Sequence, residues 1–264
     1  MPDTPMAAET VTITGHNGDA IEAYFARPTT DGPHPGVVVI HHMPGYDRST
    51  KEITRTFAVY GYDAICPNLH HRYAPGAKAT DAAAATMEAG GVPDDQCIGD
   101  VQGAADYLRA LPTANGKVGI IGYCSGGRQS YVVACSIDVD AAVDCYGGRV
   151  VATPDDLTPA RPISPIDRTP DLRCPLLGLF GVEDTNPSPE QVAQIEEALR
   201  ANDKTYEFHT FENAGHAFFT VDRPNYRVDA SREGWKLIWD FFGRHLAERV
   251  GTNLRHKPGR RPVL

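Results

Sequence analysis

Short apolar runs alternate with amphipathic stretches along most of the chain. Residues 36–40 read Gly-Val-Val-Val-Ile, an uninterrupted apolar run typical of a strand that is buried on both faces. Between residues 98 and 111 the apolar side chains recur at intervals of three or four positions, which predicts a helix with one buried face. Regular alternation of strands and helices predicts an α/β fold with a mostly parallel central sheet and helices on both faces.

The same patterns predict the remaining elements. Residues 11–14 and 21–25 alternate in polarity and flank Asn17-Gly18, the dipeptide that most strongly indicates a hairpin. Further strands are predicted at 63–67, 117–122, 141–145, 175–180 and 205–211, and helices at 47–60, from about 126, at 190–199 and at about 229–249. Residues 69–95, with an alanine run at 82–85, and the proline-rich residues 151–174 are expected to be irregular.

Composition narrows the classes of function. The 264 residues suit a single domain at 1–250 followed by a basic tail at 251–264. A formal net charge of −9 argues against a nucleic-acid or anionic-membrane partner, and no apolar stretch approaches the length of a membrane span. The first residues carry no secretory signal and the six cysteines show no C-x-x-C spacing, so we expect a cytoplasmic protein with reduced thiols.

A cysteine framed by glycines directly follows one of the predicted strands. Residues 122–127 read Gly-Tyr-Cys-Ser-Gly-Gly, the G-x-nucleophile-x-G pattern of a sharp strand-to-helix turn. Glycines are needed there because side chains would clash with the neighbouring strand and helix. The turn exposes Cys124 above the sheet, at the start of a helix whose dipole favours a thiolate. Cys124 is therefore predicted to be the nucleophile of an acyl-transfer reaction.

An acid and a histidine follow the cysteine in chain order, each just past a predicted strand. Asp184 comes after the strand at 175–180, and His216 comes after the strand at 205–211. Because the carboxyl ends of parallel strands meet at one edge of a sheet, both side chains should lie beside Cys124. A base and a group that orients it are what a thiol nucleophile needs. Glu183 is the alternative acid, which spacing alone does not exclude.

These motifs resemble those of the dienelactone hydrolase family, a carboxymethylenebutenolidase-like branch of the α/β-hydrolases that uses cysteine where most relatives use serine. The resemblance covers nearly the whole chain, and the turn around the cysteine is its most specific part. The matching segments are residues 122–127, Gly181-Val-Glu-Asp184 with Pro187, Asn213-Ala-Gly-His-Ala-Phe218 and, more loosely, 37–45 and 72–76.

The resemblance implies an α/β-hydrolase fold and a role for each of the three reactive side chains. Cys124 would be the nucleophile, and His216 would act as general base and then as general acid. Asp184, rather than Glu183, would be the carboxylate that orients the histidine. The implied partner is a small-molecule ester or lactone. No cofactor is expected, and a monomer and a dimer both remain open.

By the same resemblance, two backbone N–H groups would form the oxyanion hole. One belongs to Ser125, and the other belongs to Met43, which follows the early strand. Pro44 has no N–H, which is consistent with Met43 as the donor. Tyr123 is adjacent to the nucleophile and is predicted to line the substrate pocket.

One departure from the family pattern concerns the resting thiol. Family members have a glutamate after the early strand that contacts this thiol, and the corresponding position here is His42 or Met43. We hypothesise that His42 lies near Cys124 and, by being partly cationic, raises its thiolate fraction. The alternative is a neutral His42 in the pocket wall.

A second departure concerns the substrate's charge. The family binds a substrate carboxylate with two arginines, but this chain has Thr220 at one of those spacings and no Lys or Arg from 79 through 108. Arg72, which we include among the pocket residues, or Arg223 could supply a clamp instead. A bidentate arginine pair selects a planar carboxylate, so a neutral ester, lactone or thioester is expected rather than dienelactone.

Other readings of the sequence compete with this one. The pairs His41-His42 and His70-His71 follow neighbouring strands, but adjacent residues in extended backbone point to opposite faces, so no metal site is predicted. A thioesterase or acyltransferase would use the same three side chains, because access to the pocket decides which acceptor reacts. A non-catalytic α/β-hydrolase scaffold that binds a small ligand would have no need for all three in this order.

Overall fold

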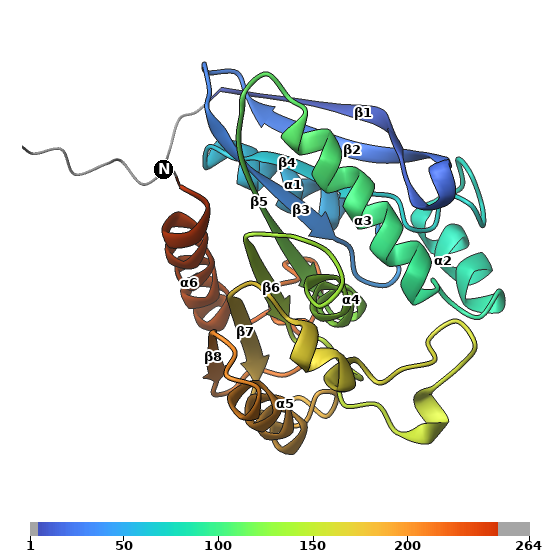
Figure 1. Cartoon of the computed structure of the whole chain (residues 1–264), viewed down its shortest axis with the longest axis vertical. Helices are drawn as coiled ribbons and strands as arrows, with labels where there is room; N and C mark the ends of the chain where they lie inside the picture. The colour runs from blue at the N-terminus through green and yellow to red at the C-terminus, as the bar shows by residue number, and fades with distance from the viewer. Residues whose placement is uncertain (1–4, 248–264) are drawn as a thin grey trace, which may run out of the picture.

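The structure, a computed structural model, describes residues 5–247. The predicted basic tail at 251–264 and the end of the predicted C-terminal helix lie outside the described residues. Eight strands form one sheet in the order β1-β2-β4-β3-β5-β6-β7-β8 (Figure 1). Their bounds are β1 Met6–Thr14, β2 Ala20–Pro28, β3 His34–Ile40, β4 Asp63–Pro67, β5 Ala114–Tyr123, β6 Ala141–Cys145, β7 Leu176–Gly181 and β8 Tyr206–Phe211.

The strands from β4 to β8 in this order are parallel, and β2 is antiparallel to both β1 and β4. β1 and β2 form the hairpin predicted from Asn17-Gly18, with Asn17 at a φ of 56° and Gly18 at 82°. The mostly parallel α/β architecture predicted from the alternating pattern is confirmed. Because βαβ units connect the parallel strands, the loops at their carboxyl ends gather at one edge of the sheet.

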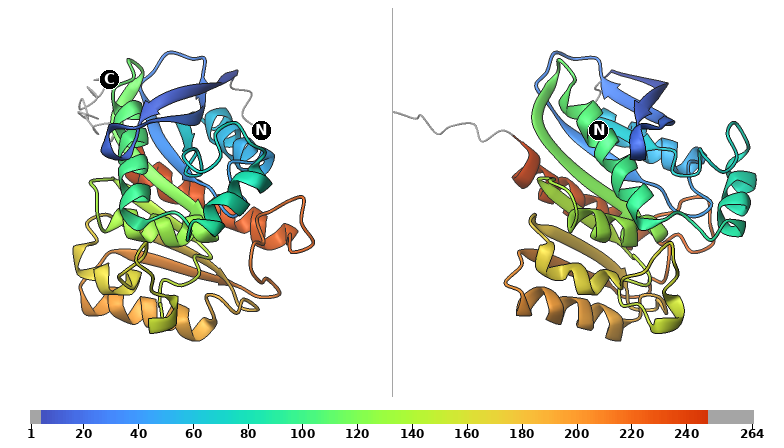
Figure 2. Two further views of the ribbon diagram at one scale, coloured as in Figure 1. Left: turned by 90° about the vertical axis from the view of Figure 1, so that its right-hand side faces the viewer. Right: turned by 45° about the vertical axis from the view of Figure 1, so that its right-hand side comes forward.

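Helices cover both faces of the sheet (Figure 2). The helices are α1 Arg48–Val59, α2 Ala79–Glu88, α3 Asp94–Arg109, α4 Ser125–Ala134, α5 Pro189–Ala201 and α6 Val228–Leu246. α1 and α6 pack on one face, and α3, α4 and α5 pack on the other. Successive residues of β3 divide between the two cores, Val37 and Val39 in one and Val38 and Ile40 in the other, as the alternation of side chains along a strand requires.

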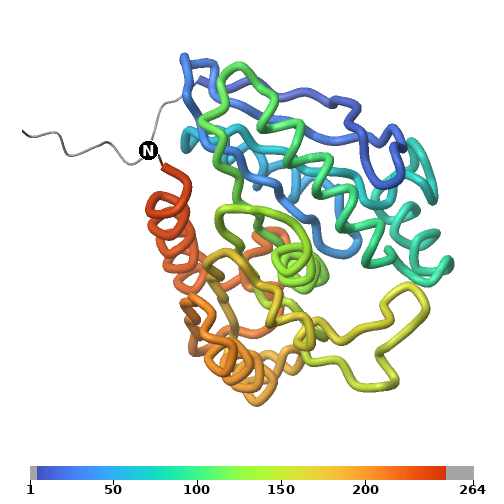
Figure 3. The backbone as a smooth tube through the Cα atoms, in the orientation of Figure 1, coloured from blue at the N-terminus to red at the C-terminus, as the bar shows by residue number. Residues whose placement is uncertain are grey.

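Two segments expected to be irregular contain helical structure. The alanine run belongs to α2, and Asp94 begins α3 inside the stretch 69–95. Alanine has the highest intrinsic helix propensity, and this outweighed the lack of an apolar stripe. The proline-rich connection between β6 and β7 (yellow in Figure 3) holds short 3₁₀ helices at Pro154–Asp156 and Pro165–Asp171. Among the described residues, no helix has both the length and the apolar character of a membrane span.

Candidate active site

Cys124 stands at the turn between β5 and α4, in a backbone conformation that few residues adopt. Its φ of 55° and ψ of −119° lie outside the regions that side chains favour. The turn is tight because a Cβ on Gly122 would collide with the carbonyl oxygen of Gly126, and a Cβ on Gly126 would collide with that of Ile40. The half-buried Cys124 therefore points out at the carboxyl edge of the sheet, directly before the first turn of α4.

His216 and Asp184 reach Cys124 from the loops that follow β8 and β7. His216 Nε2 lies 2.9 Å from Cys124 Sγ, and His216 Nδ1 lies 2.8 Å from Asp184 Oδ2. Asp184 is 5% exposed, and its other oxygen accepts a hydrogen bond from the backbone N–H of Asn186 at 2.9 Å. The alternative acid, Glu183, is exposed to solvent. The structure thus joins Asp184, His216 and Cys124 in one chain of contacts.

The hydrogen-bond partners of His216 raise its pKa. Burial disfavours the imidazolium, but the hydrogen bonds to Asp184 and Cys124 outweigh burial and raise the pKa of His216 to about 10. The backbone around the ring is also constrained, since Ala217 has a φ of 65° and the Asn225 side-chain amide donates to the His216 carbonyl at 2.9 Å. The imidazole is therefore held as a proton donor toward the sulfur.

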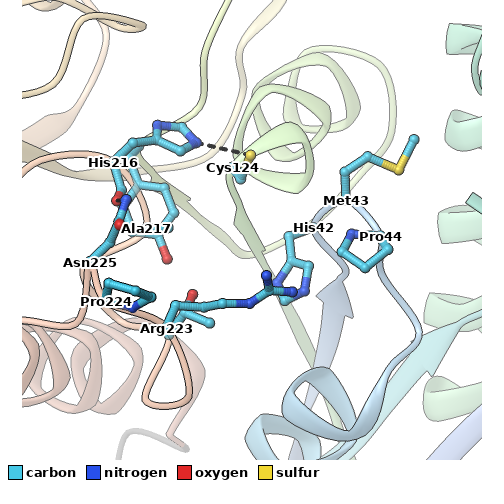
Figure 4. Close-up of a pocket in the computed structure, with 11 residues that line it drawn as sticks. His42, Met43, Pro44, Cys124, His216, Ala217, Arg223, Pro224 and Asn225 are labelled. Carbon is cyan, nitrogen blue, oxygen red and sulfur yellow. Dashed lines mark hydrogen bonds between the residues drawn. The ribbon is translucent and has the colours of Figure 1, made fainter. Parts of the chain in front are cut away.

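A cavity of about 320 Å³ opens in front of the sulfur (Figure 4). We call it the Cys124 cavity. Its walls come from the loop after β3, from Tyr146 after β6 and from the loop after His216. The lining residues are His42, Met43, Pro44, Cys124, Tyr146, His216, Ala217, Thr220, Arg223, Pro224 and Asn225. This volume falls within the size range of sites for small organic molecules.

The two residues predicted to form the oxyanion hole, Met43 and Ser125, both lie close to Cys124. Met43 lines the cavity, and Ser125 is the first residue of α4. Neither backbone N–H donates a hydrogen bond within the part of the chain that the structure describes. An N–H at the start of a helix lacks a partner inside the helix, so the Ser125 N–H remains available to a developing oxyanion.

His42 lines the same cavity as Cys124 and contacts the carboxylate of Asp47, which does not line it. His42 Nε2 lies 3.0 Å from Asp47 Oδ2, and the other oxygen of Asp47 accepts from the Thr50 N–H at 2.9 Å. Burial raises the pKa of Asp47, but the bonds to His42 and Thr50 outweigh it and hold that pKa well below its usual range. The hypothesis that His42 is partly cationic stays a prediction.

Two residues predicted for the pocket lie elsewhere. Tyr123 is 2% exposed and packs against Tyr146 and Phe219 in the core under α6, because its side chain leaves the strand on the opposite face from the cavity. Arg72 donates to both oxygens of Asp100 at 2.8 and 3.0 Å and to Asp19 at 2.7 Å. These carboxylates occupy the guanidinium, and neither Tyr123 nor Arg72 lines the Cys124 cavity.

Sequence reasoning missed Tyr146 as a wall of the cavity and left Arg223 open. Tyr146 has a φ of 46°, and its ring packs edge-on against His216 with centroids 5.2 Å apart. Arg223 extends from the loop after His216 in the direction of His42 (Figure 4). The phrase Tyr-Gly-Gly after β6 was the available signal for a tight turn at Tyr146. Arg223 carried none, because its loop follows no regular pattern.

Of the neighbouring histidines, His42 lines the Cys124 cavity, whereas His41 and His70 contact each other away from it. His41 Nδ1 donates to the His42 carbonyl at 3.0 Å, and His41 Nε2 accepts from the Leu69 N–H at 3.2 Å. The His41 and His70 rings meet edge-on, with centroids 4.7 Å apart. Across the described residues, no group of three or more His, Cys, Asp or Glu side chains has a geometry that could hold a metal ion.

Comparison with known proteins identifies a family and similar proteins for this chain. Residues 21–246 match the model of the dienelactone hydrolase family. A protein of Methylorubrum extorquens described as "Putative carboxymethylenebutenolidase" is 32% identical over 252 residues, covering 90% of this chain and 86% of that protein. One of Escherichia coli K12 with the same description is 33% identical over 250 residues, covering 91% and 88%. A solved structure from Klebsiella pneumoniae, described as "Putative Dienelactone Hydrolase", superposes with a TM-score of 0.82 at 29% identity, covering 91% of this chain and 100% of that one.

Proposed function

Because this chain belongs to the dienelactone hydrolase family, we propose that it hydrolyses a small ester or lactone with Cys124 as the nucleophile. The observation that carries the proposal is the contact of Cys124 Sγ with His216 Nε2 at 2.9 Å, in a ring whose other nitrogen lies 2.8 Å from Asp184. A thiol, a base and an acid that orients the base form the arrangement that nucleophilic acyl transfer needs.

Acylation begins when the Cys124 thiolate attacks the carbonyl carbon of the ester. The carbonyl π electrons move to oxygen, and the backbone N–H groups of Met43 and Ser125 stabilise the oxyanion. The intermediate then collapses, the C–O bond breaks, and His216 Nε2 gives its proton to the leaving oxygen. In a lactone this oxygen stays attached to the acyl chain as a hydroxyl.

Deacylation reverses the proton flow. His216, now neutral, takes a proton from water as the water oxygen attacks the thioester carbon. Collapse breaks the C–S bond, releases the carboxylic acid and restores the thiolate beside the imidazolium. Asp184 keeps the ring in one orientation throughout, because its two oxygens are held by His216 and the Asn186 N–H.

The charge of the substrate follows from the arginines. Arg72 is bonded to Asp100 and Asp19 and does not line the Cys124 cavity, whereas Arg223 is an exposed part of its wall. Among the arginines that the structure describes, Arg223 alone lines this cavity, whereas a pair of arginines binds the planar carboxylate in the family. We therefore propose a substrate other than dienelactone, and the preference for a neutral ester, lactone or thioester stays a prediction.

Turnover of p-nitrophenyl acetate by Cys124→Ala and Cys124→Ser tests the proposal. We expect both variants to lose at least about 10³-fold in kcat/KM, because the nucleophile and its base act as a unit. Cys135→Ala is the matched control, since Cys135 directly follows helix α4 as Cys124 directly precedes it, and it should keep the wild-type rate. Equal slow rates in all four proteins would overturn the proposal and favour a scaffold that binds a ligand without reacting.

A further inference from the structure

A second cavity, of about 620 Å³, borders the loop that forms one wall of the Cys124 cavity. Residues 42–44 line the Cys124 cavity, and residues 45–48 line the second, so one loop borders both. The remaining walls come from β2, from α1, from Asn68 and His70 after β4, and from residues 76–82 around the start of α2. α2 lies at the right of Figure 1. We call this space the basic cavity, for the side chains that line it.

Four basic side chains line the basic cavity: Arg48, Lys51, Arg55 and Lys78. Within the described residues, none of the four lies within ion-pair distance of a carboxylate. Within that part of the chain, no direct ion pair neutralises any of the four cations, although the formal net charge of the whole chain is −9. A cluster of positive side chains on a protein of net negative charge attracts an anion.

Neutral aromatic groups hold two of these cations in place. Lys51 Nζ lies 4.1 Å from the centre of the Tyr46 ring and 5.5 Å from that of Tyr24. Arg55 Nη1 donates to the Tyr24 hydroxyl at 2.8 Å. Cation–π contacts and a hydroxyl acceptor fix the side chains without cancelling their charge. Both side chains are half-buried. They are therefore already partly ordered, and binding a ligand costs less side-chain conformational entropy.

Two carboxylates, Glu22 and Asp47, also line the basic cavity. Asp47 is already engaged, since Oδ1 accepts from the Thr50 N–H and hydroxyl at 2.9 and 3.0 Å and Oδ2 lies 3.0 Å from His42 Nε2. Four cations against two carboxylates leave the walls net positive. Because Asp47 contacts His42, the walls of the two cavities are joined by a direct hydrogen bond.

Neutral donors complete the lining. His70 lines the basic cavity, its side chain is 2% exposed, and its Nδ1 has no hydrogen-bond partner among the described residues. Burial lowers the pKa of His70 to about 4, so the ring is neutral at pH 7. α2 begins in the same wall at Ala79, and the Lys78 side chain before it makes no capping hydrogen bond. The first N–H groups of a helix are donors that suit an anion.

We propose that the basic cavity binds the phosphoryl group of a small organic molecule. Lysine and arginine together with free N–H groups are the usual ligands of phosphoryl oxygens, and the volume suits a small organic ligand. The phosphoryl group belongs either to a distal part of the substrate or to a separate effector that acts through the Asp47–His42 bond. Binding needs no chemistry at Cys124, so the inference stands apart from the proposed function.

Calorimetric titration with inorganic pyrophosphate at low ionic strength tests the inference. Wild type and Cys124→Ala should both bind one pyrophosphate. Lys51→Met and Lys78→Met should each weaken binding by about tenfold or more, because hydrogen bonds to charged groups contribute at least that factor. Arg232→Gln, which removes an exposed cation from α6, is the matched control and should bind as wild type does.

Unchanged p-nitrophenyl acetate turnover in Lys51→Met and Lys78→Met would show that both variants are folded. Absence of binding to wild type, or equal binding to both variants and wild type, would overturn the inference.

A kinetic measurement separates the two sources of the phosphoryl group. If the group belongs to the substrate, pyrophosphate should inhibit hydrolysis of a phosphate-bearing ester and leave p-nitrophenyl acetate turnover unchanged. If it belongs to an effector, pyrophosphate should change p-nitrophenyl acetate turnover, and Asp47→Asn should abolish that change without abolishing binding. Both results support the site, and they assign it to different ligands.

Discussion

Two histidines at the carboxyl edge of the sheet, His216 and His41, differ in the partners that they contact. His216 contacts the Asp184 carboxylate and the Cys124 sulfur. His41 instead contacts backbone groups, the His42 carbonyl and the Leu69 N–H. Burial disfavours the charged ring in both. It lowers the pKa of His41, with help from nearby His70, to about 3, whereas the partners of His216 reverse its effect and raise that pKa to about 10.

The contrast shows that the hydrogen-bond partners of a histidine, more than its burial, determine its pKa here. His41 is neutral at any physiological pH, and its two nitrogens join the loop after β3 to the loop after β4. Under the proposed mechanism, His216 gives its proton to a leaving group and regains one from water. We therefore propose that His41 belongs to the framework of the site and His216 to its chemistry.

The largest expected effect comes from removing the Asp184 carboxylate, which contacts His216 but not His41. Asp184→Asn should lower kcat/KM for p-nitrophenyl acetate by about 10³- to 10⁴-fold, because an amide neither stabilises the imidazolium nor selects the right tautomer. Glu183→Gln is the matched control, since Glu183 is adjacent but exposed, and its rate should stay near that of wild type. A larger loss in Glu183→Gln than in Asp184→Asn would contradict the assignment of the acid.

An intermediate effect, on stability, is expected at His41. His41→Phe keeps a ring of similar size but leaves the Leu69 N–H and the His42 carbonyl without partners. Each unpaired buried group costs about 1–3 kcal/mol, so urea denaturation should show a free energy of unfolding lower by roughly 2 kcal/mol or more.

The half-buried His209 on β8 provides the control, because His209→Phe should change that free energy far less. A His41→Phe variant as stable as wild type would mean that the two hydrogen bonds do not hold the loops together.

The smallest effect is the pH dependence that His216 gives to folding. Its pKa is raised from 6.5 to about 10 in the folded protein, so folding favours the protonated ring. The resulting stabilisation is fully present below pH 6.5 and is lost as the pH rises through 10. The side chain is 32% exposed, and solvent screening reduces the effect.

Urea denaturation of wild type and His216→Gln at several pH values measures this stabilisation. The free energy of unfolding of wild type minus that of the variant should shrink from pH 6.5 to pH 10. A difference that grows with pH would contradict the raised pKa.

The sequence predicted the parts of the molecule that local patterns determine. The apolar run 36–40 indicated β3, and the glycines of 122–127 indicated the strained turn at Cys124, because both are properties of neighbouring residues. The loops that carry Asp184 and His216 could be predicted to lie near Cys124, because parallel strands bring successive loops to one edge. The catalytic roles of these residues stay a prediction. The alanine run at 82–85 lacks an apolar stripe and was expected to be irregular, but it forms part of α2 because alanine has a high helix propensity.

What the sequence could not supply are contacts between distant segments. Arg72 reads as a free cation, but Asp100 and Asp19, brought in from α3 and the β1–β2 turn, bind it away from the Cys124 cavity. Tyr123 is adjacent to Cys124, yet the direction of its side chain depends on the register of β5. The basic cavity likewise draws its cations from α1 and from the start of α2, and no local pattern links these segments.

Mass spectrometry of a quenched reaction tests the central claim most directly. Wild type is mixed with p-nitrophenyl acetate, acid-quenched before steady state and digested. Under the proposed mechanism an acetyl group, retained as a thioester, appears on the peptide that contains Cys124, and Cys124→Ala gives no such adduct. Sustained turnover with no acyl group on that peptide, or the same adduct on another cysteine, would contradict a nucleophilic role for Cys124.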